Sequence, residues 1–126
     1  MYRKDRMQFI IDRSKWRCGR NGINQRGKGG ILLLNEQGYM CCLGQISCQL
    51  NMKKKQILNK TTPNHTGQYI SILTSKRDYG IVNSVLSKKA VLINDDPNLT
   101  DQERERKLSS LFSKWKHKIR FKGKYN

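Results

Sequence analysis

Residues 99–125 read LTDQERERKLSSLFSKWKHKIRFKGKY, and this stretch decides how the chain folds. Its first half predicts a helix that begins after Thr100, because a threonine followed three residues later by Glu103 is the pattern of a capping box. Acidic residues near the start of this helix and lysines toward its end suit the helix dipole. Apolar residues at helical spacing predict a buried stripe, which consists of Leu108, Leu111, Phe112 and Trp115.

The second half of the stretch predicts a strand. From residue 118 onward, cationic residues alternate with apolar or small ones, and a period of two gives a strand one charged face and one apolar face. The cationic positions are Lys118, Arg120, Lys122 and Lys124. A short apolar run at the other end of the chain, QFIID at residues 8–12, predicts a second strand. We expect these two strands to pair, so that both ends of the chain join one sheet.

Between the two strands, shorter patterns predict local structure. They are a turn over 13–16 capped by Asp12, a buried strand over 31–34, a turn over 35–38, and helices over 39–50 and 79–87. The sequence NDDP at residues 94–97 then predicts a break before the helix that follows Thr100. We therefore expect a small α/β fold of the α+β kind. It is a single domain over residues 1–126, with a short sheet packed against two or three helices.

Residues 17–30 contain five glycines among basic and amide side chains. Glycine loses the most conformational entropy on ordering, so this segment predicts a long mobile basic loop. The segment is not a P-loop, because its glycines precede the apolar run and no Ser or Thr follows Lys28. An arm that orders on nucleic acid and a permanently disordered segment share this composition, and both interpretations stay open.

The charge of the chain indicates the class of its partner. Lys and Arg outnumber Asp and Glu by 26 to 9, a net charge of +17. Such a charge repels itself and weakens the folded state, so we expect a polyanion, by default nucleic acid, to lie against the surface. A solvated coat that only aids solubility is the alternative. No apolar run approaches the roughly 18 residues of a membrane helix, and no signal peptide is visible, so we expect an intracellular protein without a membrane partner.

Three segments supply the candidate nucleic-acid-binding residues. They are Arg13, Lys15, Arg17, Arg20, Arg26 and Lys28 in the first, Lys53, Lys54 and Lys55 in the second, and Arg120, Lys122 and Lys124 in the third. Cations on one strand face lie about 7 Å apart and can follow a phosphate backbone. Aromatic residues near the cations are candidates for base stacking, namely Trp16, Tyr39, Tyr69 and Tyr125. The alternative for Trp16, as for Phe112, Trp115 and Phe121, is a place in the core.

The sequence gives little support to metal binding or catalysis. The four cysteines, Cys18, Cys41, Cys42 and Cys48, lack the spacing of a zinc knuckle, so we expect reduced, packed thiols. The adjacent Asp95 and Asp96 are candidate ligands of a divalent cation, but the remaining carboxylates are few and scattered. We therefore predict no catalytic residue, no metal and no cofactor.

In four blocks and in their order, the sequence resembles a family of small uncharacterised phage proteins. The blocks are IDRSKW at 11–16, GYMCCLG at 38–44, INDD at 93–96 and LTDQERE at 99–105. The chain resembles that family on these blocks and departs from it in the longer, more basic segment 17–30. The resemblance implies a phage or prophage origin, a compact α/β fold and expression in the cytoplasm of an infected bacterial host. It implies no activity.

Charge, size and this resemblance together predict a non-enzymatic phage accessory protein that binds nucleic acid or a nucleoprotein complex. The target we expect it to antagonise is a host-defence nuclease, such as a CRISPR effector. Two other interpretations stay open. The protein either sequesters an anionic nucleotide signalling molecule of antiviral defence, or inhibits a host enzyme by protein–protein contact. An enclosed pocket would favour the first of these, and a partner retained after nuclease digestion would favour the second.

Overall fold

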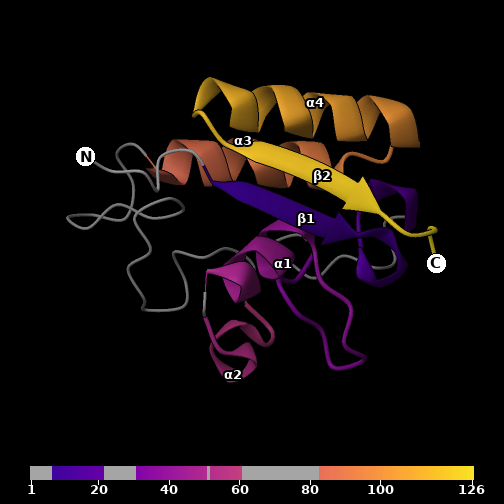
Figure 1. The fold of residues 1–126 in the computed structure, drawn as a ribbon. Coiled ribbons are helices and arrows are strands. Elements are labelled where there is room, and N and C mark those ends of the chain that lie inside the picture. Colours follow the sequence, from indigo (N-terminus) through magenta and orange to yellow (C-terminus); the bar gives the residue numbers. More distant parts are fainter. Residues whose placement is uncertain (1–6, 22–30, 51, 61–82) are drawn as a thin grey trace.

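A two-stranded sheet joins segments from the two ends of the chain (Figure 1). The computed structural model describes residues 7–21, 31–50, 52–60 and 83–126. Strands β1 (Gln8–Asp12) and β2 (Lys118–Lys122) pair in parallel, with Phe9 opposite Ile119. The predicted pairing of the terminal strands and the predicted α+β class are therefore confirmed.

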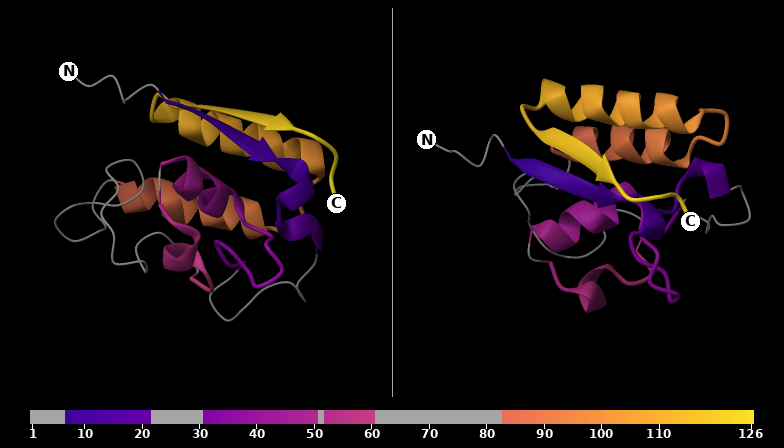
Figure 2. Two further views of the ribbon diagram at one scale, coloured as in Figure 1. Left: turned by 60° about the horizontal axis from the view of Figure 1, so that its bottom comes forward. Right: turned by 45° about the vertical axis from the view of Figure 1, so that its right-hand side comes forward.

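Helices fill the connection between the two strands, as a parallel pair requires. They are α1 (Cys42–Gln49), α2 (Lys54–Ile57), α3 (Asn83–Asp95) and α4 (Asp101–Lys114), with the short 3-10 helices η2 (Arg13–Lys15) and η3 (Gly19–Asn21). Helices α3 and α4 pack against each other, and the strands cross in front of α4 (Figure 2). Helix α1 lies alongside β1, and α2 lies beyond α1.

The predicted caps are present. The hydroxyl of Thr100 accepts the Glu103 N–H at 3.1 Å, and the Glu103 carboxylate accepts the Thr100 N–H at 2.9 Å, so α4 begins with the expected capping box. Asp12 caps η2 by accepting the Ser14 N–H at 3.0 Å. Leu108, Leu111 and Phe112 of the predicted stripe are buried, and the ring of Phe112 lies edge-on to Phe9 at 6.5 Å. Trp115 is only partly buried and is the C-cap of α4 rather than part of the helix.

Several predicted elements differ from the structure. The segment 31–34 is largely buried but is no regular strand: Leu34 forms an isolated bridge with Leu58, and the Leu33 N–H bonds the Lys60 carbonyl at 2.7 Å. Helix α1 begins at Cys42 rather than at residue 39. Helix α3 continues to Asp95, because the apolar run that precedes the break is part of the helix. Residues 79–82 of the predicted helix lie outside the described part.

Part of the predicted basic loop is packed into the molecule. Residues 17–21 contain η3, and Cys18 is fully buried there. Gly19 lies so close to Asp96 that a Cβ atom would come within 2.1 Å of its carbonyl oxygen. The prediction of a mobile loop is therefore wrong for residues 17–21, because this close packing fixes the backbone. Residues 22–30 lie outside the described part.

Trp16 belongs to the core. Its side chain is 0% exposed, and its indole N–H donates to the Asn94 side-chain oxygen at 2.7 Å. The same oxygen accepts the Cys42 N–H at 3.1 Å, so one buried amide joins the chain after β1 to the start of α1. The stacking role predicted for Trp16 is wrong, because no base can reach a ring buried in this way.

Candidate nucleic-acid interface

The solvent-facing side of the sheet carries the cations of β2. Lys118, Arg120 and Lys122 are exposed, whereas Ile119 is buried and Phe121 packs against the core. Alternate residues of a strand point to opposite faces, so the three cations share one side of the sheet at a spacing of about 7 Å. The predicted division of this strand into a charged and an apolar face is confirmed. We call these three residues, together with Lys15, the cationic face.

The neighbouring strand adds little charge to this side. Ile10 is 39% exposed on β1 and gives the surface an apolar part. Asp12 carries a carboxylate, to which Ser14 donates from its hydroxyl at 2.7 Å and from its N–H at 3.0 Å. These bonds lower the pKa of Asp12, and Lys122 and Lys15 lower it further. Asp12 therefore stays ionised at neutral pH and offsets one positive charge.

A shallow hollow of about 360 Å³ lies where the cationic face meets α1. Lys15 and Lys122 both line it, and so does the half-buried thiol of Cys48. Burial raises the pKa of Cys48, while the ammonium of Lys54 on α2 acts in the opposite direction. Residues from two of the three predicted basic segments, Lys15 and Lys122, therefore line the hollow.

Two glutamines of α1 close the outer edge of β1. Gln49 accepts the Ile10 N–H at 2.9 Å and donates to the Ile10 carbonyl at 2.7 Å. Gln45 likewise accepts the Asp12 N–H at 2.7 Å and donates to the Asp12 carbonyl at 3.0 Å. A carboxamide offers one acceptor and a donor group, as a peptide group does, so α1 stands in for a third strand. We did not predict this role, although two glutamines four residues apart on one helix were the visible signal.

Two of the candidate arginines already face carboxylates. Arg13 donates to both oxygens of Glu105 at 2.8 Å and to the Gly123 carbonyl at 3.1 Å. The bonds to Glu105 raise the pKa of Arg13. Arg20 pairs with Asp101 at 3.1 Å. Since each guanidinium has an internal counter-charge, both are poorer phosphate ligands than the lysines of the cationic face.

Arginines also cover the aromatic rings that we predicted to stack on bases. The guanidinium of Arg17 lies 3.9 Å from the centre of the Tyr39 ring. The ring of Tyr125 is stacked on Trp16 at 5.9 Å and has the Arg20 guanidinium at 4.5 Å. A base would have to displace these groups to stack.

The remaining candidates lie on α2, after the end of β2, or outside the described part. Lys53 and Lys55 are exposed at the start of α2, and Lys124 is exposed beyond the end of β2. Three predicted residues, Arg26, Lys28 and Tyr69, lie outside the described residues.

The cysteines and the acidic pair serve the fold. Burial raises the pKa of the Cys41 thiol to about 12. Burial also raises the pKa of Cys42 well above its ordinary value. Asp95 is buried and accepts the Ile31 N–H at 3.1 Å. Among the residues that the structure describes, no group of three His, Cys, Asp or Glu side chains is arranged to hold a metal ion.

No known family model matches the chain, and neither does any curated protein or solved structure. In the described ranges, no helix has the length and apolar character that crossing a membrane demands. The chemistry of the surface must therefore indicate the function. In the described part of the chain, the cationic face is where strand geometry sets cations in a row.

Proposed function

We propose that the protein binds nucleic acid through the cationic face. The observation that carries this proposal is the row of Lys118, Arg120 and Lys122 on one solvent-facing side of β2, continued by Lys15 at the adjoining hollow. A row of cations follows a phosphate backbone, and each phosphate that is neutralised releases condensed counterions. The exposed side chain of Ile10 lies on the same side of the sheet and supplies an apolar contact for sugars or bases.

The form of the hollow favours a polymer over a small nucleotide. The hollow is shallow and contains the Asp12 carboxylate, which repels a phosphate placed inside it. The amides of Gln45 and Gln49 are already bonded to β1 and have little capacity left for a ligand. A polyanion that lies across the surface avoids both obstacles, because it needs no enclosure.

We also propose what the protein binds in the cell. The phage resemblance and the charge of +17 support a nucleoprotein target in the cytoplasm of a bacterial host. A defence nuclease with a nucleic-acid channel, such as a CRISPR effector, has this chemistry, and antagonising it is the role that we propose. A pull-down from host lysate before and after nuclease digestion separates this role from a purely protein-held complex, which would survive digestion.

The test is binding of labelled oligonucleotides, single-stranded and duplex, measured by fluorescence anisotropy over a series of salt concentrations. If each of the four cations of the cationic face contacts one phosphate, the affinity should fall with a log–log slope of about −3 to −4. Replacing Lys118, Arg120 and Lys122 together by glutamine should reduce that slope in magnitude by about 2 to 3, because three contacts are lost.

A second triple variant serves as the matched control. Replacing Lys88, Lys89 and Arg106 by glutamine removes the same net charge from exposed positions on α3 and α4. This control should keep the slope of the wild type within about 1. Equal losses in the two triple variants would mean that only net charge matters and would contradict a defined face. Affinity that does not change with salt would contradict nucleic-acid binding by cations altogether.

A further inference from the structure

The outer edge of β2 is open in the part of the chain that the structure describes. The Lys118 N–H bonds the Met7 carbonyl at 2.9 Å, so the peptide groups of residues 118, 120 and 122 face β1. In a parallel ladder, those of Ile119 and Phe121 then face away from β1. Over residues 7–21, 31–50, 52–60 and 83–126, no hydrogen bond reaches these outward groups. On the outer edge of β1, by contrast, the glutamines of α1 bond the peptide groups of Ile10 and Asp12.

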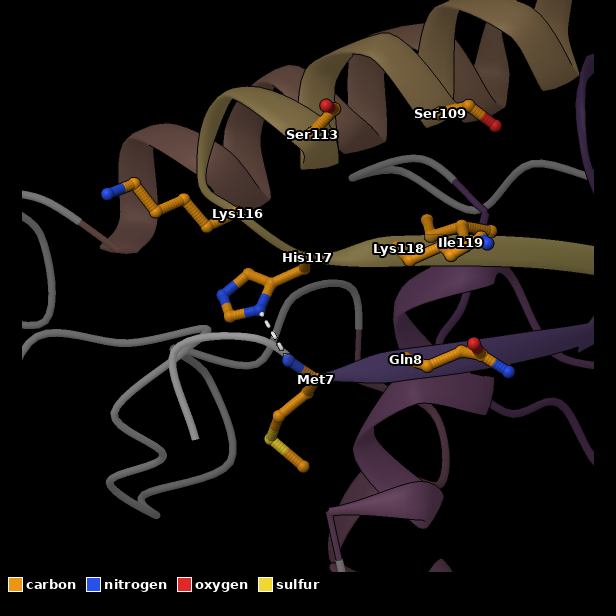
Figure 3. A pocket seen from close by; sticks show the side chains of 8 residues that line it. All are labelled: Met7, Gln8, Ser109, Ser113, Lys116, His117, Lys118 and Ile119. Atoms are coloured by element: carbon orange, nitrogen blue, oxygen red, sulfur yellow. Dashed lines mark hydrogen bonds between the residues drawn. The ribbon is translucent and has the colours of Figure 1, made fainter. Parts of the chain in front are cut away.

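A groove of about 820 Å³ runs beside this open edge (Figure 3). Ser109 and Ser113, one turn apart on α4, line one side, and β2 at Ile119 lines the other. At the start of the two strands the groove continues past His117 to Met7 and Gln8. Lys116 and Lys118 also line the groove and make it positive. An unpaired strand edge beside a groove is the arrangement that accepts an added strand from another chain.

We propose that an extended acidic segment of a partner protein adds to the outer edge of β2 as a third strand. Its main chain pairs with the outward peptide groups of Ile119 and Phe121. On one side of the added strand, alternate side chains lie beside the cations of β2, which selects Asp or Glu at those positions. On the other side they enter the groove against Ser109 and Ser113, where small or β-branched residues fit.

A second copy of this chain suits the edge less well. Pairing β2 with β2 would bring rows of Lys and Arg together, and like charges across a strand pair are destabilising. The lysines and the arginine therefore disfavour self-association at this edge and favour an acidic strand. This inference concerns the edge of β2 and does not depend on nucleic-acid binding at the cationic face.

The test uses two peptides of the same charge. One is a labelled peptide of alternating Glu and Val, and the other carries N-methyl groups on the alternate amides that would pair with β2. We expect the methylated peptide to bind the full chain at least about tenfold more weakly, because it loses main-chain hydrogen bonds while keeping its charge. Amide hydrogen exchange, followed by NMR, should slow at Ile119 and Phe121 only with the unmethylated peptide.

Each other outcome counts against the proposal. Equal binding of the two peptides would mean adhesion by charge alone. Protection of amides elsewhere, without Ile119 and Phe121, would place the peptide on another surface. Protection of these two amides by an oligonucleotide but not by the peptide would assign the groove to nucleic acid. Absence of binding at millimolar peptide would exclude an acidic strand as the occupant. The results with the two peptides do not change the salt dependence expected for the cationic face, so the two proposals fail separately.

Discussion

At the residue scale, the missing side chain of Gly44 determines how closely α1 packs on the segment 31–34. A Cβ atom at Gly44 would lie 1.8 Å from the carbonyl oxygen of Leu33, which is backbone and cannot rotate away. In an open helix, a change from glycine to alanine stabilises by about 1 kcal/mol. The local propensity and the tertiary contact therefore predict opposite signs for the same substitution.

We expect Gly44→Ala to lower the free energy of unfolding by roughly 2 kcal/mol or more, because the overlap forces α1 away from Leu33. Urea unfolding followed by circular dichroism measures this change. Gln102→Ala, at an exposed position of α4, is the control and should change stability by less than about 0.5 kcal/mol. If Gly44→Ala stabilised the protein, the close packing of α1 on this segment would be disproved.

At the scale of elements, helix α1 takes the place of a third strand beside β1 in the part of the chain that the structure describes. Gln45 and Gln49 satisfy peptide groups of β1 that an edge strand would otherwise expose to water. An isolated pair of strands is only marginally stable, so this contact with α1 helps to hold the sheet.

We expect Gln45→Leu to destabilise the protein by about 2 kcal/mol, because the Asp12 peptide groups lose partners in a partly buried place. Gln49→Leu should cost only about 1 kcal/mol, since water can replace its exposed bonds to Ile10. Amide hydrogen exchange at Asp12 and Ile10 should become faster in the respective variants. Gln102→Leu on α4 is the control. Unchanged exchange in both glutamine variants would contradict the role of α1 as a substitute strand.

At the scale of the whole molecule, three segments far apart in sequence meet at Glu105. Arg13 follows β1, Glu105 lies on α4, and Tyr125 follows β2 and donates its hydroxyl proton to the same carboxylate. Burial raises the pKa of Glu105, but the bonds from Arg13 and Tyr125 outweigh it, so the folded pKa lies below the ordinary value of 4.5. The carboxylate is therefore more acidic in the folded chain than in the unfolded chain.

This shift predicts a pH dependence of stability. A depressed folded pKa contributes stability that is fully present above about pH 4.5 and is lost as the pH falls through the folded pKa. Glu105→Gln should destabilise the protein by about 1 to 2 kcal/mol at neutral pH, and the difference from the wild type should shrink on acidification below about pH 4.5. Urea titrations over a pH series measure this convergence.

Tyr125→Phe is the matched variant for that experiment. It removes one hydrogen bond but keeps the ion pair of Arg13 with Glu105. At neutral pH, Tyr125→Phe should lower the free energy of unfolding by less than Glu105→Gln does. The stability of this variant should keep most of the pH dependence of the wild type. If the wild type and Glu105→Gln differed by a constant amount across the pH series, the carboxylate would not be the titrating group.

Much of the fold could be predicted because its signals are local. The capping box at Thr100 and the two-residue alternation after Lys118 depend on spacings of two or three residues, which the printed sequence displays directly. The segment 31–34 could not be assigned in this way. Its backbone bonds reach Lys60 and Asn59 instead of a regular neighbouring strand, and an apolar run does not reveal its partner.

The sequence by itself determined the excess of positive charge, the start of α4 and the division of β2 into a charged and an apolar side. The tertiary structure alone decided which cations are paired with a carboxylate of the chain and which remain exposed to a partner. Arg13 and Arg20 meet the carboxylates of Glu105 and Asp101, residues 92 and 81 positions away, whereas the lysines of β2 stay exposed. Within the described part of the chain, it also decided that α1 bonds the outer edge of β1 at Ile10 and Asp12, while the outer edge of β2 stays open. The physical reason is range: helix caps and strand alternation depend on neighbours along the chain, while charge pairing and edge closure depend on groups that only folding brings together.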